Sequence, residues 1–258
     1  MASRAETGDA EETQAAEEAL PHGALAQAQE LERARVTLFR AIRTTARMLE
    51  VRGFEITMVG PVSVESGDRA AQAAAMAVYG SAERATTAER SREIVLEAAV
   101  PAVPERFTTA WADGTPPGSR VIVIVIDQGN VETIREVVEE MATMGARGAV
   151  LLSRKDLTSF SKKFLLETPA CARIQHFQFV DLQAAICDHS LVPRHVPLDA
   201  VASARLRKRY VGGPFPRLLP RDPMVRFLGL GVGALVAVRE AFGREQATLT
   251  YLEVSDAN

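Results

Sequence analysis

The run Val-Ile-Val-Ile-Val-Ile at residues 121–126 constrains the fold more than any other part of this 258-residue chain. Every side chain in the run is apolar and β-branched, which is typical of a central strand buried on both faces of a sheet. A helical pattern follows at residues 131–144, where Asn130 is a candidate N-cap and Gly145 a stop. The sequence therefore predicts a buried strand that leads directly into an amphipathic helix.

Two further apolar segments extend this alternation. Residues 148–152 and 174–180 are expected to be strands, and the helix between them has Asp156 or Thr158 as its candidate cap and runs through Leu166. Strand–helix–strand–helix–strand order is typical of a compact α/β domain in which neighbouring strands pair in parallel.

The first hundred residues are less regular. Residues 1–28 are rich in Ala, Glu and Gln and contain few large apolar side chains, which predicts a mobile acidic tail. A helical stripe occupies the segment from Glu30 to Gly53, and two shorter helices are expected at 69–78 and 88–98. A strand is expected at 106–111, ahead of a Gly- and Pro-rich turn.

Prolines interrupt the chain repeatedly after Asp188, so the domain boundary is placed there. Asp199 is expected to cap a helix that ends at Tyr210. Asp222 is expected to cap a short helix with Pro223 at its first position, followed by residues 224–228. Residues 234–240 and 247–254 have the pattern of a hairpin. The predicted class is α/β: a disordered acidic tail (1–30), an amino-terminal α/β domain (31–188) and a small carboxy-terminal α+β domain (189–258).

Composition excludes several classes of protein. The net charge is only −3, no apolar run is long enough for a membrane helix, and two cysteines imply no disulfide framework. Charge is nevertheless unevenly placed, because residues 194–226 contain eight basic and two acidic side chains. Such a stretch suits a polyanion or an acidic protein partner, or it forms a solvated helix face.

Enzymatic functions find little support. The run Gly229-Leu-Gly231-Val-Gly233 has GxGxG spacing, but no long helix follows it as a nucleotide-binding loop requires. Asp127 ends a buried strand alone, without a carboxylate–lysine cluster for metal-assisted cleavage. The order Cys171, His176, Cys187, His189 matches no familiar zinc spacing, so no metal or cofactor is expected.

An ordered series of short motifs runs through the last quarter of the chain. It comprises His-x-Leu-Val-Pro-x-His, a helix ending in Tyr, a Phe-Pro crossing, Asp-Pro-x-x-Arg-Phe-x-Gly, a further Gly and a strand ending in Arg. The residues that carry it are His189, Pro193, His195, Tyr210, Pro216, Asp222, Pro223, Arg226, Gly229, Gly233 and Arg239. This series resembles the carboxy-terminal assembly domain of the fifth-largest subunit shared by the nuclear RNA polymerases, a domain that has a small archaeal counterpart.

The upstream chain is similar to the same family, more loosely. The opening helix with its Arg52-Gly53-Phe54 link, and the strands and helix from 121 to 153, resemble the amino-terminal jaw domain, which the archaeal counterpart lacks. Residues 158–161 and 231–232 depart from the family pattern. The chain therefore resembles a divergent lineage, or a paralogue dedicated to one polymerase.

The resemblance implies a non-catalytic subunit of a nuclear DNA-directed RNA polymerase (I, II or III), without cofactor or membrane contact. Its carboxy-terminal domain would dock on the largest subunit through the eleven motif residues, and its jaw domain would lie near downstream duplex DNA. The implied DNA-proximal residues surround a helix start suited to phosphate: Arg154, Lys155, Thr158, Ser161, Lys162 and Lys163.

Several alternatives stay open. The cations near Thr158 also suit a solvated edge, and Arg226 would pair with Asp222 or with a partner's carboxylate. His189 and His195 are interface donors or internally satisfied histidines. A free-standing transcription adaptor, and less plausibly a nuclease-like or nucleotide-binding enzyme, are the alternative functions.

Overall fold

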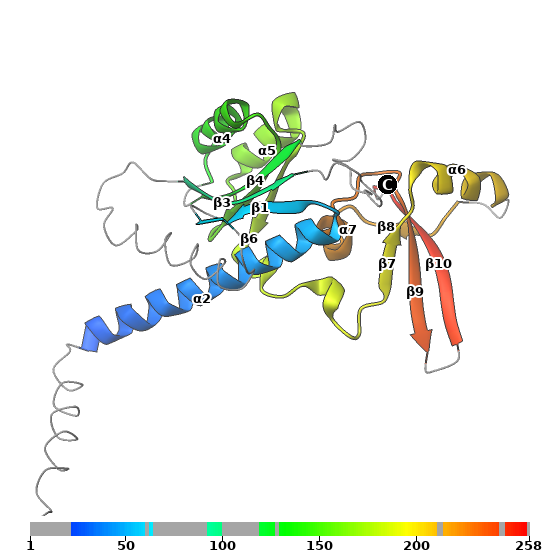
Figure 1. Cartoon of the computed structure of the whole chain (residues 1–258), viewed down its shortest axis with the longest axis horizontal. Coiled ribbons are helices and arrows are strands. Elements are labelled where there is room, and N and C mark those ends of the chain that lie inside the picture. The colour runs from blue at the N-terminus through cyan, green and yellow to red at the C-terminus, as the bar shows by residue number, and fades with distance from the viewer. Residues whose placement is uncertain are drawn as a thin grey trace, which may run out of the picture.

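The computed structural model describes residues 22–59, 62–63, 92–99, 119–126, 129–210, 214–242 and 246–256. Within them the chain forms two sheets flanked by helices (Figure 1). The six-stranded sheet has the order β2-β1-β3-β4-β5-β6, and the four-stranded sheet has the order β7-β9-β10-β8. This arrangement confirms the predicted α/β class.

The large sheet is parallel on one side and antiparallel on the other. Strands β4, β5 and β6 pair in parallel, as the sequence predicts, whereas β1 and β3 pair antiparallel with their neighbours. The strand bounds are β1 Glu55–Val59, β2 Val62–Ser63, β3 Arg92–Ala99, β4 Arg120–Ile126, β5 Ala146–Ser153 and β6 Ile174–Gln178. The sheet is therefore mixed, and its central strand β4 joins the two halves.

Strand β3 corrects the helix expected at residues 88–98. The segment pairs along its length with β4, from Arg92 opposite Ile126 to Ala99 opposite Arg120. Its glutamates and alanines are good helix formers, but helix propensity amounts to less than about 1 kcal/mol per residue, and the ladder to a buried strand outweighs it.

Helices cover both faces of the large sheet (Figure 1). Helices α4 (Val131–Met144) and α5 (Ser159–Glu167) lie on one face, and the long helix α2 (His22–Val51) lies on the other. The alternate side chains of β4 divide between the two cores: Ile122, Ile124 and Ile126 pack with α4, while Val121 and Val123 pack with α2. This explains why all six residues of the run are apolar.

The predicted helix ends hold in detail. The side chain of Asn130 accepts a hydrogen bond from the Thr133 amide at 2.7 Å, and Gly145 ends α4 in the left-handed conformation with φ 64. Of the two candidate caps of α5, Thr158 is the one used, because its hydroxyl accepts from the Ser161 amide at 3.2 Å.

Some boundaries differ from those expected. Helix α2 begins at His22, inside the segment expected to be tail, and the strand expected to reach residue 180 ends at Gln178. Three short 3-10 helices connect the later elements: η1 Pro169–Cys171, η2 Phe179–Leu182 and η3 Ile186–Asp188. The helix expected at 69–78 and the strand expected at 106–111 lie outside the described residues.

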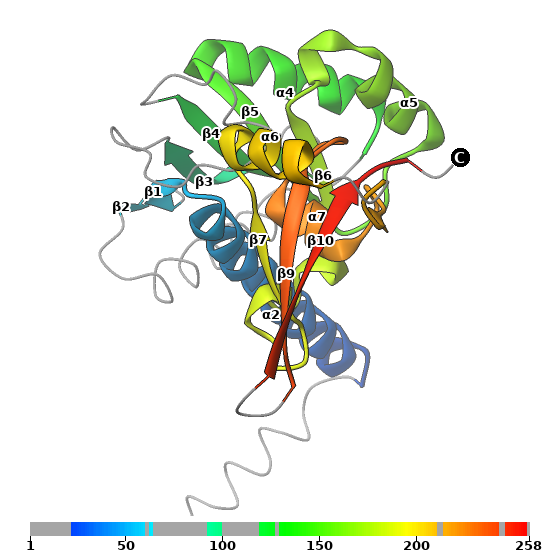
Figure 2. The same ribbon diagram turned by 90° about the vertical axis from the view of Figure 1, so that its right-hand side faces the viewer.

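The four-stranded sheet has one buried face and one partly covered face. Its elements are β7 Arg194–Pro197, α6 Ala200–Arg209, β8 Arg217–Leu218, α7 Pro223–Leu228, β9 Leu235–Phe242 and β10 Gln246–Val254. Val236, Val238 and Val254 pack against Val225 of α7, and α6 crosses the other face (Figure 2). The β9–β10 hairpin and both capped helices are as predicted, while β7, flanked by prolines, was not.

Among the described helices, none combines the length and the apolar character that a bilayer crossing requires.

Candidate functional site

The two sheets meet at a buried arginine. Arg52 follows the end of α2 and is 1% exposed. Its Nε donates to the carbonyl oxygen of Phe227 at 2.9 Å, and its Nη2 donates to that of Arg226 at 2.7 Å. Both carbonyls belong to the last turn of α7, where carbonyls lack partners within the helix and attract a cation. Burial lowers the pKa of Arg52 to about 9, so the guanidinium is still charged at neutral pH.

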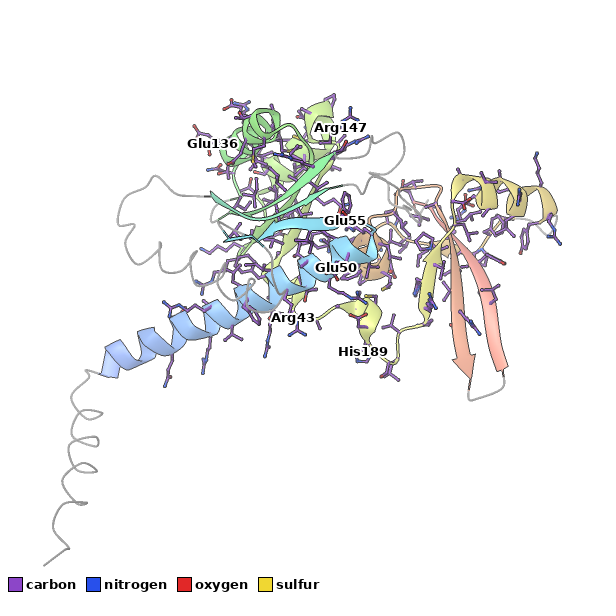
Figure 3. The ribbon with its side chains drawn as sticks, viewed as in Figure 1. Arg43, Glu50, Glu55, Glu136, Arg147 and His189 are labelled. Atoms are coloured by element: carbon purple, nitrogen blue, oxygen red, sulfur yellow. The ribbon has the colours of Figure 1, made fainter. Side chains whose placement is uncertain are left out.

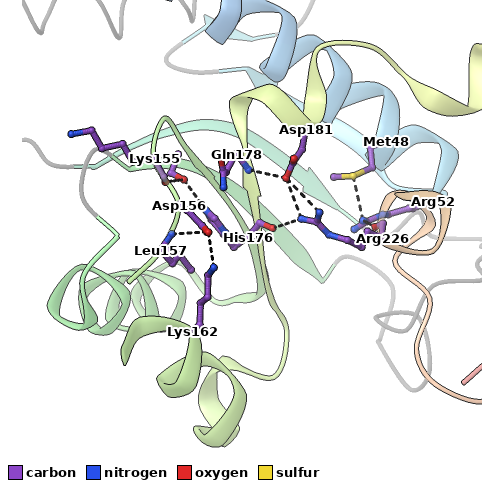
Figure 4. Close-up of polar contacts among 11 residues, drawn as sticks. Met48, Arg52, Lys155, Asp156, Leu157, Lys162, His176, Gln178, Asp181 and Arg226 are labelled. Atoms are coloured by element: carbon purple, nitrogen blue, oxygen red, sulfur yellow. Dashed lines mark hydrogen bonds and ion pairs between the residues drawn. The ribbon is translucent and has the colours of Figure 1, made fainter. Parts of the chain in front are cut away.

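Arg226 makes the reverse connection, from α7 to the large sheet (Figure 4). Its Nη2 donates to the carbonyl oxygen of His176 in β6 at 2.9 Å, and the guanidinium lies 3.4 Å from the carboxylate of Asp181. The same guanidinium lies 4.6 Å from the centre of the Phe177 ring. Within the chain the carboxylate near Arg226 is therefore Asp181, whereas Asp222, the candidate expected from the sequence, caps α7 through the Met224 amide at 2.8 Å.

Most other motif residues of the carboxy-terminal segment shape its backbone. Pro223 is the first residue of α7, Gly229 ends it with φ 66, and Gly233, with φ 87, donates to the Val254 carbonyl at 2.7 Å. The Pro216 carbonyl accepts from the Glu253 amide at 2.9 Å. These positions shape the turn between α7 and β9 and attach the neighbouring segments to β10.

The two histidines of the motif are held locally. His195 Nδ1 lies 2.7 Å from the carbonyl oxygen of Pro193, and His189 Nδ1 accepts from the Leu191 amide at 3.2 Å. His189 is exposed on the connection between the sheets (Figure 3). Both contacts match the internally satisfied alternative, and His189 remains accessible.

An open groove of about 480 Å³ lies between α6 and the four-stranded sheet. Its lining is largely apolar, with two arginines at its edge: Leu198, Ala202, Arg205, Leu206, Arg209, Tyr210 and Tyr251. Arg207 anchors α6 beside it by donating to Glu253 at 2.8 Å and to the Gly233 carbonyl at 2.9 Å. Tyr210 ends α6 and stacks on Phe215, with 4.5 Å between ring centres.

The sheet face beyond the groove is exposed and mixed in character. Arg194 pairs with Arg239, and Arg239 with Leu249, across β7, β9 and β10. Leu249 is 53% exposed, and Val196 two positions along β7 is 41% exposed. Apolar side chains bordered by arginines suit a partner surface that combines apolar and acidic groups.

The predicted DNA-proximal residues cluster at the start of α5, as expected from their spacing. The side chains of Thr158 and Ser161 are hydrogen-bonded to each other, with 2.7 Å between their hydroxyl oxygens, and Ser161 is fully buried. Lys162 Nζ lies 2.6 Å from Asp156 Oδ2, and this pair lowers the pKa of Asp156. The two hydroxyls therefore cap the helix, while the lysine is held beside a carboxylate.

Two more of the predicted DNA-proximal cations, Arg154 and Lys163, also form ion pairs with carboxylates of the chain. Arg154 lies 3.3 Å from Glu30 of α2, and Lys163 lies 3.7 Å from Glu167. Lys155 is exposed and has no ion pair with any residue in the described part of the chain. Exposed pairs are weak, so these cations can exchange partners at little cost.

A serine and a histidine lie behind this loop. Ser153 donates to the Lys155 carbonyl at 2.5 Å, so its oxygen accepts from Nε2 of His176, 2.7 Å away. The serine proton is thus directed to the backbone, and the histidine does not activate the serine as a nucleophile. Burial lowers the pKa of His176 to about 4, which keeps the ring neutral at neutral pH. The pair positions the loop before α5.

The cysteines lie apart from this cluster. Cys171 is buried in the core beneath α4, and Cys187 contacts Asp188. No group of three or more His, Cys, Asp or Glu side chains suited to a metal ion occurs within the described ranges.

Comparison with known proteins gives this geometry a context. No family model matches the chain. Curated relatives named "DNA-directed RNA polymerases I, II, and III subunit RPABC1" match it in Caenorhabditis elegans, at 27% identity over 136 residues, and in Caenorhabditis briggsae, at 27% over 110 residues. The counterpart of that name in Dictyostelium discoideum matches at 30% over 112 residues.

These matches cover about half of the chain, between 42% and 51%, and 52%, 57% and 64% of the three relatives. The chain therefore spans less than two thirds of the length of each. They confirm the resemblance drawn from the sequence: the chain has curated homologues named as the subunit shared by RNA polymerases I, II and III.

Sequence reasoning missed two parts of the site. Arg52 was noticed only as part of a link, and Leu198 and Ala202 of the groove carry no motif. A buried arginine gives no local signal, because its partners Arg226 and Phe227 lie more than 170 positions away.

Proposed function

We propose that the chain is a non-catalytic subunit of a eukaryotic DNA-directed RNA polymerase, acting in the nucleus. The observation that carries this proposal is its similarity to three relatives named as the subunit shared by polymerases I, II and III. The neutral His176, whose serine partner is committed to a backbone carbonyl, also argues for a positioning role over a catalytic one.

The carboxy-terminal unit (189–258) docks on the largest polymerase subunit. Its groove between α6 and β10 and the neighbouring face around Leu249 form the docking surface. Apolar side chains there supply contact area, and Arg205 and Arg209 select a partner segment flanked by acidic residues. Arg207 holds α6 against the sheet, so the surface is preorganised before binding.

The amino-terminal unit (31–188) is the jaw, and it lies along downstream duplex DNA. The start of α5 faces the phosphates, with Lys155 as the first contact and Lys162, Lys163 and Arg154 as exchangeable cations. Because these three already pair with carboxylates of the chain, the contact is weak, independent of base sequence and reduced by salt.

Affinity purification of the tagged full chain from its own cells, followed by mass spectrometry of the proteins that accompany it, tests the proposal. Largest subunits of all three nuclear polymerases are the result expected of a shared subunit, and a single one identifies a dedicated paralogue. Recovery without any polymerase subunit overturns the proposal and favours a free-standing adaptor.

A charge reversal separates the docking surface from the rest of the chain. Arg205→Glu with Arg209→Glu is expected to reduce recovery of the largest subunit at least tenfold, because both residues edge the groove. The matched control reverses two exposed arginines of α2, Arg33→Glu with Arg40→Glu. Equal recovery with both double variants would rule out the groove as the docking surface.

A further inference from the structure

Two segments with family motifs, far apart in sequence, contact each other inside the molecule. The segment Arg52-Gly53-Phe54 ends the opening helix, and the segment 222–229 forms α7 in the carboxy-terminal unit. Arg52 donates to the carbonyls of Phe227 and Arg226, in the last turn of that helix, at 2.9 and 2.7 Å, and its Nη2 also lies 3.3 Å from Met48 Sδ. The contact is therefore made by backbone of one unit and a buried side chain of the other.

A second arginine reaches in the opposite direction. Arg226, on the same turn of α7, donates to the carbonyl of His176 at 2.9 Å and lies against Asp181 and the Phe177 ring. Each unit thus supplies one guanidinium that binds backbone carbonyls of the other (Figure 4). We call Arg52 and Arg226 the arginine clasp.

Closely packed side chains and backbone surround Arg52 and the end of α7. Phe227 is 3% exposed and belongs to the same core as Leu49, Phe54 and Val121 of the large-sheet unit. A Cβ at Gly229 would lie 3.0 Å from Cζ of Arg52, so only glycine leaves the guanidinium its present room. A planar fork that makes two directional hydrogen bonds in a closed space fixes rotation as well as distance.

We propose that the arginine clasp is a rigid joint that sets the orientation of the carboxy-terminal unit relative to the six-stranded sheet. Arg52 is the positioning residue of this joint. The joint would have a consequence in the polymerase: once the carboxy-terminal unit has docked, it determines where the start of α5 lies. This consequence alone rests on the proposed function. Hydrogen bonds also connect the joint to the loop before α5. Arg226 donates to the backbone carbonyl of His176, and the His176 side chain is hydrogen-bonded to Ser153.

The test is a distance measurement across the joint by double electron–electron resonance on the full chain. Spin labels replace exposed Glu139 of α4 and Lys208 of α6, in a background that carries Cys171→Ala and Cys187→Ser. The background protein is expected to give one narrow distance distribution. Arg52→Met is expected to shift or at least double the width of that distribution, while far-ultraviolet circular dichroism verifies that the protein is folded.

Three further variants keep the test decisive. Arg52→Lys retains the charge without the fork and is expected to give an intermediate width. Arg226→Gln removes the half of the clasp that is partly exposed, so it tests the joint even if Arg52→Met does not fold. The matched control Arg40→Met, at an exposed position of the same helix, is expected to leave the distribution unchanged.

A broad distance distribution in the background protein would contradict the proposal of a rigid joint. So would a distance distribution that is unchanged in the folded variants Arg52→Met and Arg226→Gln. The measurement uses the chain alone, so its result is independent of whether polymerase subunits accompany the chain. Failure of the proposed function and failure of the joint are therefore separate outcomes.

Discussion

Replacing Gly229 with alanine perturbs the contact between α7 and the buried guanidinium of Arg52. Gly229 ends α7 in the left-handed conformation, with φ 66. A Cβ added there would meet three atoms of the Arg52 guanidinium, Cζ at 3.0 Å, Nε at 3.1 Å and Nη1 at 3.2 Å. The substitution therefore combines backbone strain with displacement of a buried charge.

The two effects have different sizes. An alanine in the left-handed region costs about 1–2 kcal/mol relative to glycine. Arg52 is 1% exposed and cannot move into solvent, so yielding to the new methyl group loosens its hydrogen bonds to two carbonyls. A hydrogen bond to a charged group is worth about 1.5–3 kcal/mol, so losing one brings the total to about 2.5–5 kcal/mol.

Gly145 provides a matched control. It ends α4 with φ 64, nearly the same backbone conformation, but nothing lies within 4 Å of a Cβ at that position. Urea unfolding followed by circular dichroism is expected to show a loss of about 1–2 kcal/mol for Gly145→Ala and about 1.5–3 kcal/mol more for Gly229→Ala. Equal losses within about 0.5 kcal/mol would refute the argument that Arg52 occupies that space.

Three further predictions concern titration and charge. Burial lowers the pKa of His176 from 6.5 to about 4, so the unfolded chain binds the proton more readily than the folded one. Acidification from pH 6.5 to 4 should therefore remove up to about 3 kcal/mol of unfolding free energy, a dependence that His176→Gln abolishes in urea titrations at stepped pH. The lowered pKa of Asp156 and Asp188 acts mostly near and below their ordinary value of 3.8, so these two carboxylates add only a small loss at the acid end of this window. Asp156→Asn removes the ion pair of Lys162, while the new side-chain oxygen can still accept a hydrogen bond from the Leu157 amide. The affinity of the chain for duplex DNA, measured by fluorescence anisotropy at low salt, should therefore rise severalfold. An unchanged affinity would argue against α5 as part of the DNA-facing surface. Arg47→Ala breaks an ion pair whose side chains are 46% and 50% exposed, and calorimetry should detect a loss of no more than about 1 kcal/mol.

The parallel half of the fold could be predicted from the sequence because its signals are local. The apolar run of β4, the cap at Asn130 and the stop at Gly145 each specify one element through its own residues. Once three strands are separated by helices, parallel order follows from the handedness of the crossover. The same holds for α6 and α7, since Asp199 and Asp222 cap them as their positions before a helical pattern predict.

The antiparallel half could not be predicted in the same way. Strand β3 is specified by its ladder to β4, a tertiary partner that its own composition does not indicate. Strand β7 is four residues long and includes a proline, and it lies at the edge of its sheet, where a missing amide donor is tolerated. In both cases pairing with a neighbour decides the structure.

Several motif residues of the carboxy-terminal unit have a role inside the chain. Asp222, Arg226 and Gly229 are engaged within the chain, as a helix cap, a bond to β6 and a close approach to Arg52. Such roles restrict residue type severely, because a cap, a fork and a left-handed turn each admit few side chains. The groove between α6 and β10 contains the motif residue Tyr210 among other large side chains, which can be exchanged for one another more freely. At Asp222, Arg226 and Gly229 the pattern therefore records how the unit is held to the rest of the chain.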